Sequence, residues 1–357
     1  MPDFLVRRDD LRNCRIDEAE PPALDAGKAL LRVERFGLTT NNVTYAVFGD
    51  AMKYWSFFPA PDGWGRVPMW GFARVEQSAA AGVEPGQRFY GYVPPSSHLV
   101  VEPSHVDEHG FSDGSAHRAS LPAAYQRYAL TTGDPFYRDT TEDLQMLLRP
   151  LFFTSFLIDD ELADTGRATS GSVLFGSASS KTAIGAAFLL SQRAGAEPVA
   201  LTSQRSAAFI EGLGIYDRTI TYDDIASLDR QPAAFVDMSG DARVRQAVHE
   251  HFGDELRHSM VVGATHRDAP PAAGQPRLPG PPPAFFFAPD RVKKRSIDWG
   301  IATLQSRAAD AWHPFCEWAG GWLEVIPGSG FDAIEPAWID VLDGGVPPDR
   351  AHALSLT

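Results

Sequence analysis

The chain has 357 residues, of which 44% are hydrophobic and 22% charged, which is ordinary for a soluble globular protein large enough for two domains with separate cores. The formal net charge of −14 argues against nucleic acid or an anionic membrane surface as a partner. The two cysteines, Cys14 and Cys316, lie too far apart in sequence to indicate a metal motif or a disulfide framework, and no apolar run approaches the roughly 18 residues of a membrane span.

The N-terminal part of the chain is predicted to be rich in β-structure. Apolar runs occur at 29–36, 71–76 and 82–93, with Gly or Pro between them. Short strands interrupted this often are typical of a small barrel rather than of β–α–β units. Residues 94–140 are rich in Pro, His, Ser and Gly, so loops and edge strands are expected there. The first residues, MPDFLVRRDDLRN, lack the apolar region of a signal peptide, which favours the cytoplasm.

The middle of the chain changes character. A helix is predicted from about Thr141, with Thr140 or Thr141 as its N-cap, through an apolar stretch to Asp159 and Asp160. Strands then alternate with helical stretches such as 241–252, which indicates a parallel, doubly wound sheet. The predicted strands of this region are 173–175, 198–201, 218–222, 234–238 and 259–264. The later segments are predicted as a proline-rich loop at 269–289, a helix at 290–312 and short strand-like pieces over 323–357.

The most informative segment is SVLFGSASSKTAIGAAFLLSQRAGAEPVALTSQR, residues 172–205. Its order of strand, tight turn, helix and strand is the β–α–β unit that places phosphate groups at a helix N-terminus. Backbone N–H groups and the positive end of the helix dipole favour an anion there. Lys181 adds a positive charge, and the serines and threonine around it add hydroxyl groups. The segment therefore predicts a turn that binds a cofactor phosphate.

The turn departs from the usual dinucleotide pattern. A G-x-G-x-x-G turn places glycines where the backbone approaches the pyrophosphate, but here Gly176 is followed by no glycine until Gly185. A P-loop is also disfavoured, because Phe175 and Ser180 occupy the positions of its two glycines. The alternative is a degenerate turn that binds nothing.

Several segments resemble the medium-chain dehydrogenase/reductase superfamily, and within it the zinc-free quinone oxidoreductases and enoyl reductases. GKALLRVERFGLTTNNVTY is similar to its N-terminal segment, VEPGQRFYGY to a later strand, and LGIYDRTITYDD, FVDMSGD and VVGATH to its coenzyme domain. The phrases FFTSFLIDD and FFFAPDRVKKRSIDWG also resemble a bacterial branch of this superfamily without an assigned activity.

This resemblance implies an α/β fold with two domains. It implies a GroES-like β-barrel catalytic domain formed by residues 1–140 and 313–357, and a Rossmann-type coenzyme domain with a doubly wound parallel sheet at 141–312. It also implies a homodimer that acts on a small-molecule substrate. The zinc enzymes of the superfamily carry a cysteine and a Gly-His-Glu motif where this chain reads TTNNVTY and PMWGFARVE, so no metal is expected.

The expected coenzyme is NADPH. The strand that ends near Leu201 is followed by Ser203 and Arg205 and not by the acid that would bind a ribose 2′-hydroxyl, so an arginine is available for a 2′-phosphate. A solvated surface arginine is the alternative interpretation of Arg205. The residues expected to bind the coenzyme are Gly176, Ser177, Ala178, Ser179, Ser180, Lys181, Thr182, Ser203, Arg205, Ser239, Gly263, Ala264 and Thr265.

The resemblance also supplies catalytic candidates. Tyr45 matches the position where zinc-free relatives place a tyrosine beside the nicotinamide, and its phenol could hydrogen-bond a developing enolate or alkoxide oxygen. Asn41 is expected in the same loop. A tyrosine that only packs there is the alternative.

Three further groups are candidate site residues. Asp160 is a candidate acid if burial raises its pKa, although a helix end that faces solvent is the favoured interpretation of Asp159 and Asp160. Thr154 matches the family region at the nicotinamide end. Arg291 and Arg295 lie in the strongest basic cluster and could bind an acidic substrate, or they could form a charged helix face.

The leading functional prediction is a zinc-independent, NADPH-dependent reductase of a small carbonyl or α,β-unsaturated carbonyl compound. In such an enzyme the cofactor carries the chemistry and the protein orients and polarises the acceptor. A non-redox lyase or aldolase-like enzyme that has lost the usual dinucleotide turn is one alternative, and a non-catalytic binding protein is another, because a fold alone does not decide function.

Overall fold

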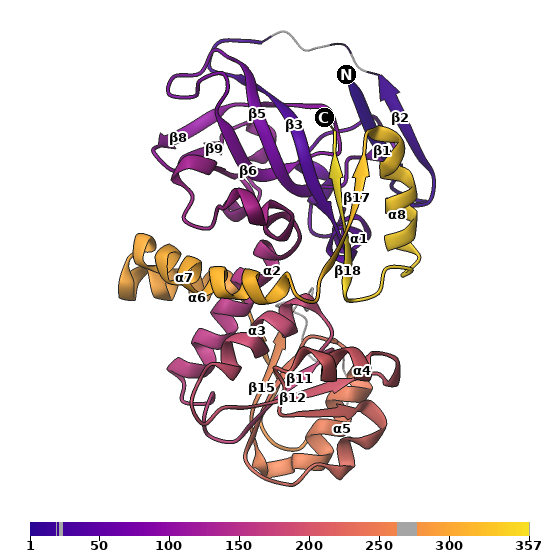
Figure 1. Ribbon diagram of the computed structural model, residues 1–357, viewed down its shortest axis with the longest axis vertical. Helices are drawn as coiled ribbons and strands as arrows, with labels where there is room; N and C mark the ends of the chain where they lie inside the picture. Colours follow the sequence, from indigo (N-terminus) through magenta and orange to yellow (C-terminus); the bar gives the residue numbers. More distant parts are fainter. Residues whose placement is uncertain (19, 21–23, 263–276, 357) are drawn as a thin grey trace. The chain divides into compact units, whose positions relative to one another are not determined.

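The computed structural model of the protein describes residues 1–18, 20, 24–262 and 277–356 (Figure 1). The chain divides into two compact units, unit 1 with Met1–Leu147 and Ala319–Thr357, and unit 2 with Leu148–Trp318. Unit 2 is therefore one continuous insertion into the sequence of unit 1. The boundaries expected from the sequence lie in the short helix η5 (Asp139–Thr141) and inside helix α7 (Ile301–Ala319).

Unit 1 is built mainly of antiparallel β-structure. Its large sheet has the order β17-β18-β3-β5-β6-β10-β9-β8, with β7 also paired to β3, and a smaller sheet has the order β2-β1-β4. Its strands are β1 (Pro2–Arg7), β2 (Cys14–Glu18), β3 (Ala29–Leu38), β4 (Trp64–Gly65), β5 (Met69–Ser78), β6 (Arg88–Val93), β7 (His98–Val101), β8 (Pro103–Asp107), β9 (Gly110–Asp113), β10 (Arg127–Leu130), β17 (Glu324–Ser329) and β18 (Arg350–Ser355).

The C-terminal residues complete the core of unit 1. Strand β18 pairs with β3, and the buried Trp338 of α8 donates its indole N–H to the carbonyl of Leu11 at 2.7 Å. The helices of this unit are α1 (Thr40–Val47), α8 (Ile334–Leu342) and the short helices η1 (Tyr54–Ser56), η2 (Ala116–Arg118), η3 (Ala123–Tyr125), η4 (Thr131–Gly133), η5 and η8 (Phe331–Ala333). The prediction of strand-like pieces alone after residue 323 is wrong for α8, whose apolar residues recur at helical spacing.

Unit 2 contains a six-stranded sheet whose pairs are all parallel. Its strand order is β13-β12-β11-β14-β15-β16, which reverses direction at β11. Right-handed crossovers then place α3 and α4 on one face and α5 on the other. The strands are β11 (Ser172–Gly176), β12 (Glu197–Thr202), β13 (Arg218–Thr221), β14 (Ala233–Asp237), β15 (Leu256–Val262) and β16 (Ala284–Phe286).

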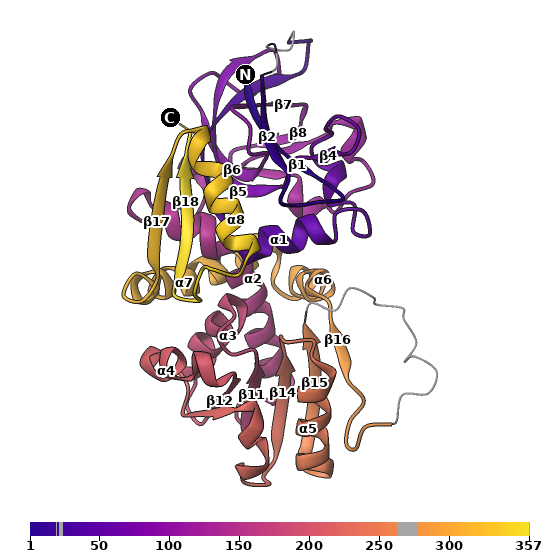
Figure 2. The same ribbon diagram turned by 90° about the vertical axis from the view of Figure 1, so that its right-hand side faces the viewer.

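The helices of unit 2 differ from the sequence prediction in two places. Its helices are α3 (Lys181–Ser191), α4 (Gln204–Leu213), α5 (Ala242–Phe252), α6 (Ala288–Trp299), α7 and the short η6 (Tyr222–Ser227) and η7 (Gly253–Glu255), with most of α2 (Glu142–Asp164). The single helix expected over 290–312 is two helices, because Gly300 ends α6 with a φ of 84°. The loop expected over 269–289 contains β16, which extends the sheet beside β15 (Figure 2).

Together these elements form the two-domain α/β fold expected from the sequence, with a Rossmann-type sheet in unit 2 and a GroES-like β-domain in unit 1. The parallel sheet is confirmed, and so is the predicted β-rich character of the N-terminal part, whose strands pair mainly antiparallel.

Close packing of α3 on α2 within unit 2 requires glycine at 185. A Cβ atom there would lie 2.6 Å from Oγ and 3.0 Å from Cβ of Ser155, a buried side chain held by the carbonyls of Leu151 and Thr182. We expect Gly185→Ala to lower the free energy of unfolding by about 1–3 kcal/mol despite its better helix propensity.

Gly212 provides the matched control, because it lies in α4 and a Cβ atom added there would meet only open space. Gly212→Ala should raise stability by about 0.5–1 kcal/mol in the same denaturant titration. Equal effects of the two substitutions would show that the α2–α3 contact is not tight.

Candidate functional site

The candidate coenzyme turn begins at the carboxyl end of the central strand of unit 2. Gly176, the last residue of β11, pairs in register with Leu201 of β12 and Asp237 of β14. A Cβ atom at Gly176 would lie 3.2 Å from the ring of Phe235, so the backbone lies close to its neighbours there. Ligands of doubly wound sheets bind at the carboxyl ends of the strands beside the point where the strand order reverses.

The turn itself leads into the N-terminus of α3. Ser177 has a φ of 52°, a left-handed conformation in which glycine is usually found. The Oγ of Ser180 caps α3 by accepting the backbone N–H of Ala183. The backbone N–H groups of Ser179 and Thr182 have no acceptor among the described residues, and both residues are half-buried. These donors and the helix dipole favour a bound anion.

Two tyrosines outside the predicted site residues hold this turn. The hydroxyl of Tyr222 accepts the backbone N–H of Ser177 at 3.2 Å, and the hydroxyl of Tyr216 donates to the carbonyl of Ala178 at 3.0 Å. Their positions follow from the β13 region and its pairing with β12, which brings the residues around 216–222 to the turn. The only sequence signal for this role is that Tyr216 lies just before a predicted strand and Tyr222 is the last residue of that strand.

Asp237 fixes the next loop along the sheet. Its buried carboxylate accepts the N–H groups of Ser239 and Gly240 and the hydroxyl of Ser239, and it pairs with Arg245. The hydroxyl of Ser239, a predicted coenzyme contact, is thus used to shape the loop. The sequence signal for this role of Asp237 is an acidic residue near the end of the predicted strand 234–238.

The remaining predicted coenzyme residues are distributed around β12 and β15. Ser203 directly follows β12, and Arg205 is exposed in the first turn of α4, with no acidic partner among the described residues. Gly263, Ala264 and Thr265 lie outside the described residues. Ser203, Arg205, Ser239 and the turn at 176–182 therefore belong to one unit and follow the carboxyl ends of three adjacent strands.

A dinucleotide fits this part of unit 2. The N–H groups of Ser179 and Thr182 and the N-terminus of α3 would hold the pyrophosphate, and Arg205 would face a 2′-phosphate. The fit requires that the phosphates use these donors, because the N–H groups of Ser177 and Ala178 already donate to Tyr222 and to the carbonyl of Leu201.

The candidate catalytic tyrosine lies in unit 1 on α1, which replaces the loop expected around Asn41. Thr39 caps this helix, and the side chain of Asn42 returns a hydrogen bond to the Thr39 N–H. Asn41 and Tyr45 are four residues apart on the helix, so their side chains meet, and the Asn41 amide donates to the Tyr45 hydroxyl at 2.7 Å.

Tyr45 lies in an aromatic cluster of unit 1. Its ring contacts those of Tyr54 at 4.5 Å and Tyr92 at 5.7 Å between centroids, and the Trp70 indole N–H lies 3.4 Å from its hydroxyl. Burial raises the pKa of Tyr45 to about 12. The phenol is therefore neutral at physiological pH. Its oxygen accepts hydrogen bonds from Asn41 and Trp70, and the hydroxyl of Tyr92 lies close enough to influence its pKa as well.

The pair Asp159 and Asp160 is buried, so the interpretation of a helix end facing solvent is wrong. Both Oδ atoms of Asp159 accept from Arg193, at 2.7 and 2.6 Å. Burial raises the pKa of Asp159, and Arg193 opposes that shift. The two carboxylates point in different directions, as expected of neighbours on a helix.

Asp160 pairs with Arg291 and Arg295 of α6. Their Nε atoms lie 2.5 and 2.7 Å from one Asp160 oxygen, and both guanidinium groups also contact Asp164. Arg291 and Arg295 are 6% and 7% exposed, so they do not form a solvated helix face. Asp298 and Lys294 pair with these residues, and the resulting cluster of six charged side chains binds α6 to α2. The catalytic role of Asp160 and the substrate role of the arginines stay predictions, and the geometry favours a structural role for all three.

The structure adds no contact that supports a site role for Thr154, and it offers no metal site or membrane span among the described residues. Thr154 is half-buried on α2, and its role at the nicotinamide end stays a prediction. No group of three or more His, Cys, Asp or Glu side chains in the described part of the chain could hold a metal ion. Within the same residues, no helix is both long and apolar enough to cross a membrane.

The fold is similar to that of several solved oxidoreductase structures. The chain is similar to CurA of Vibrio vulnificus in complex with NADPH, with a TM-score of 0.62, 13% identity and coverage of 100% of this chain and 99% of that one. It is also similar to the yhdH oxidoreductase of Salmonella enterica in complex with NADP (TM-score 0.56, 17% identity, both chains covered to 100%). A putative NADPH:quinone reductase of Bacillus thuringiensis gives a TM-score of 0.61 at 12% identity, covering 99% of this chain and 98% of that one.

The chain itself belongs to the family described as protein of unknown function (DUF2855), whose model matches residues 36–347. A search of curated protein sequences gave no significant match. The likeness to the solved structures, at identities of 11% to 17%, is a likeness of fold.

The ion cluster around Asp160 gives a test that separates structure from catalysis. Asp160→Asn leaves two buried guanidinium groups without their shared carboxylate, so we expect the free energy of unfolding to fall by about 3–5 kcal/mol. Asp310→Asn, an exposed aspartate on α7, serves as the control and should change it by less than about 0.5 kcal/mol. An Asp160→Asn protein of unchanged stability would contradict the structural role.

Proposed function

We propose that the protein is a zinc-independent, NADPH-dependent reductase of a small carbonyl or α,β-unsaturated carbonyl compound. The observation that carries the proposal is the turn of unit 2, in which Ser179 and Thr182 present N–H groups without an acceptor among the described residues, at the N-terminus of α3. The solved structures of similar fold with NADPH or NADP support the same coenzyme class.

The proposal assigns distinct tasks to the two units. In unit 2 the turn binds the pyrophosphate, and Arg205 selects the 2′-phosphate, since a guanidinium forms paired hydrogen bonds with phosphate oxygens. When bound, NADPH supplies the hydride. In unit 1 the neutral phenol of Tyr45 donates a hydrogen bond to the acceptor oxygen and stabilises charge that develops there. The Asn41 amide keeps the hydroxyl oriented by donating to it.

We also propose, on the resemblance alone, a homodimer. From the net charge, the composition and the N-terminal residues, we further propose a cytoplasmic protein with a small-molecule substrate and no nucleic-acid or membrane partner. A second function is worth testing, because Tyr222 and Leu201 already occupy the N–H groups of Ser177 and Ala178. With these two donors occupied, the turn could have lost its dinucleotide. The protein would then be a non-redox lyase, an aldolase-like enzyme or a binding protein of the same fold.

Thermal unfolding with NADPH, NADH or no ligand distinguishes these functions. A ligand at a hundred times its dissociation constant stabilises the protein by about 2.7 kcal/mol, so NADPH should raise the melting temperature measurably and NADH should raise it less. Arg205→Gln should remove the difference between the coenzymes. Arg257→Gln, which removes another exposed arginine of unit 2, should preserve it.

If neither NADPH nor NADH raises the melting temperature, the result favours the second function. A shift with NADPH that survives Arg205→Gln unchanged would retain the reductase and reject the role of Arg205.

Tyr45→Phe tests the proposed donor. Turnover of a quinone or enone acceptor, followed by loss of NADPH absorbance, should fall about 100-fold while the affinity for NADPH is unchanged. Because the Tyr45 pKa is about 12, the donor stays protonated and its contribution should disappear only as the pH rises through that value.

The matched control is Tyr54→Phe, which removes a hydroxyl from the adjacent ring of the same cluster. It should retain most of the turnover. A Tyr45→Phe enzyme as active as the Tyr54→Phe enzyme would remove Tyr45 from the catalytic residues.

A further inference from the structure

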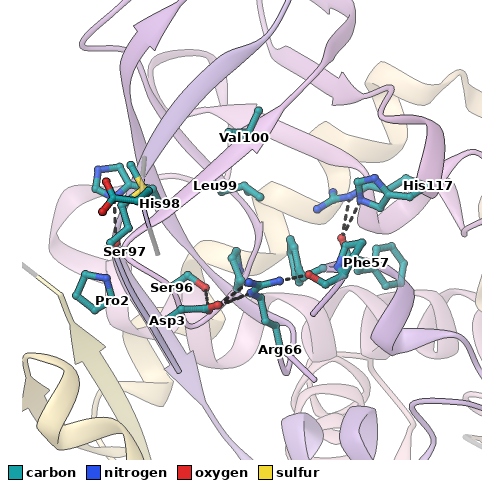
Figure 3. A pocket seen from close by; sticks show the side chains of 16 residues that line it. Pro2, Asp3, Phe57, Arg66, Ser96, Ser97, His98, Leu99, Val100 and His117 are labelled. Atoms are coloured by element: carbon teal, nitrogen blue, oxygen red, sulfur yellow. Dashed lines mark hydrogen bonds and ion pairs between the residues drawn. The ribbon is translucent and has the colours of Figure 1, made fainter. Parts of the chain in front are cut away.

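Unit 1 contains a pocket that the proposed reductase chemistry does not use. Its volume is about 310 Å³, within the usual range for small-molecule sites, and Figure 3 shows its lining side chains. The lining comes from separate segments, with Asp3 on β1, Phe57 and Phe58 after η1, Leu99 on β7, and Arg118 at the end of η2. It combines an apolar wall with charged groups.

A buried arginine with an unused donor lies in the pocket lining. Arg118 is 1% exposed, and its Nε lies 3.2 Å from both the Phe57 carbonyl and the Asp113 carboxylate. Its Nη1 lies 3.4 Å from the Tyr128 hydroxyl, but its Nη2 is buried and has no hydrogen-bond partner in the described structure. A buried N–H without an acceptor carries a desolvation cost that a ligand oxygen, such as that of a carboxylate, would offset.

The other charges of the pocket are arranged differently. Asp3 accepts from the Arg66 guanidinium through both carboxylate oxygens and also from the Ser96 hydroxyl, so these two charges compensate each other. His117 lies beside Arg118, and its Nε2 is 3.3 Å from the Phe57 carbonyl (Figure 3). The charge of Arg118 is likewise paired, with Asp113, and the group left without a partner at this side of the pocket is the Nη2 N–H of Arg118.

The apolar wall determines the shape of ligand that this donor can accept. Phe57 and Phe58 lie close to the guanidinium of Arg118, whose Cζ is 4.7 Å from the centroid of the Phe58 ring. Beyond this wall, the Phe57 ring packs edge-on against Tyr92 at 5.1 Å between centroids. One guanidinium nitrogen suits a singly charged carboxylate, and the nearby acids Asp113 and Glu20 oppose a doubly charged phosphate.

We propose that this pocket binds a small organic carboxylate, with its apolar body against Phe57, Phe58 and Leu99 and its carboxylate on Nη2 of Arg118. The site belongs to unit 1 alone, so it does not depend on coenzyme binding by unit 2. Its ligand would contact Phe57, whose ring also packs against Tyr92, a neighbour of Tyr45 in the same cluster.

Fluorine NMR of 4-fluorobenzoate tests the proposal on the full chain. The probe should broaden on addition of protein with a dissociation constant of about 1 mM or below, and 4-fluorobenzamide, its neutral counterpart, should bind at least about tenfold more weakly. Equal binding of the two probes would overturn the proposal. An unbroadened 4-fluorobenzoate signal would also overturn it and would mean that the pocket holds only solvent.

Two variants locate the bound probe. Arg118→Met should weaken binding of 4-fluorobenzoate at least about tenfold, whereas Arg12→Met, which removes an exposed arginine elsewhere in unit 1, should leave it unchanged. Because loss of the buried Arg118 could impair folding, Leu99→Trp provides an independent variant that fills the pocket and retains every charge. Its near-ultraviolet circular dichroism reports the fold.

Binding that survives Leu99→Trp in a folded protein would place the carboxylate elsewhere and overturn the assignment. The same experiments with NADPH present separate this site from the proposed function. Unchanged carboxylate affinity is expected with or without the coenzyme, whether or not the coenzyme binds.

Discussion

The candidate coenzyme site depends on the position of β11 at the centre of the parallel sheet. This strand is buried along its whole length and pairs with β12 on one side and β14 on the other. Two ladders of hydrogen bonds fix where β11 ends, and they place Gly176, Leu201 and Asp237 at one edge of the sheet. The turn, the loop after Asp237 and the start of α4 follow from that alignment.

The same alignment explains how a turn without the usual glycines is held. Ser177 adopts a left-handed backbone conformation, which costs about 1–3 kcal/mol for a residue other than glycine. The hydroxyls of Tyr222 and Tyr216 contribute hydrogen bonds on either side of it. The two tyrosines thus take over part of the role that glycine flexibility plays elsewhere, and they leave the donors of Ser179 and Thr182 for a ligand.

The two units use buried polarity in different ways. In unit 2, Asp160 balances Arg291 and Arg295, so a compact ion cluster fixes α6 on α2 and leaves no obvious chemistry. In unit 1, Arg118 has a buried N–H without a partner among the described residues, and both Arg118 and Tyr45 lie beside aromatic rings. Groups whose hydrogen-bonding capacity is not exhausted are the better candidates for ligand contacts.

The sequence by itself determined the elements whose residues interact locally. The parallel strands and the helix after Gly176 follow from apolar runs and their spacing, and the turn before Lys181 follows from their order. Helix α8 was missed although Ile334, Trp338 and Val341 have helical spacing, and the strand Ala284–Phe286 was hidden among prolines. Tertiary structure decided the partners. Asp160 pairs with arginines 131 and 135 residues later in the sequence, and Arg118 contacts Phe57 across 61 residues. Such contacts depend on how distant segments pack, and no local pattern of residues encodes that arrangement.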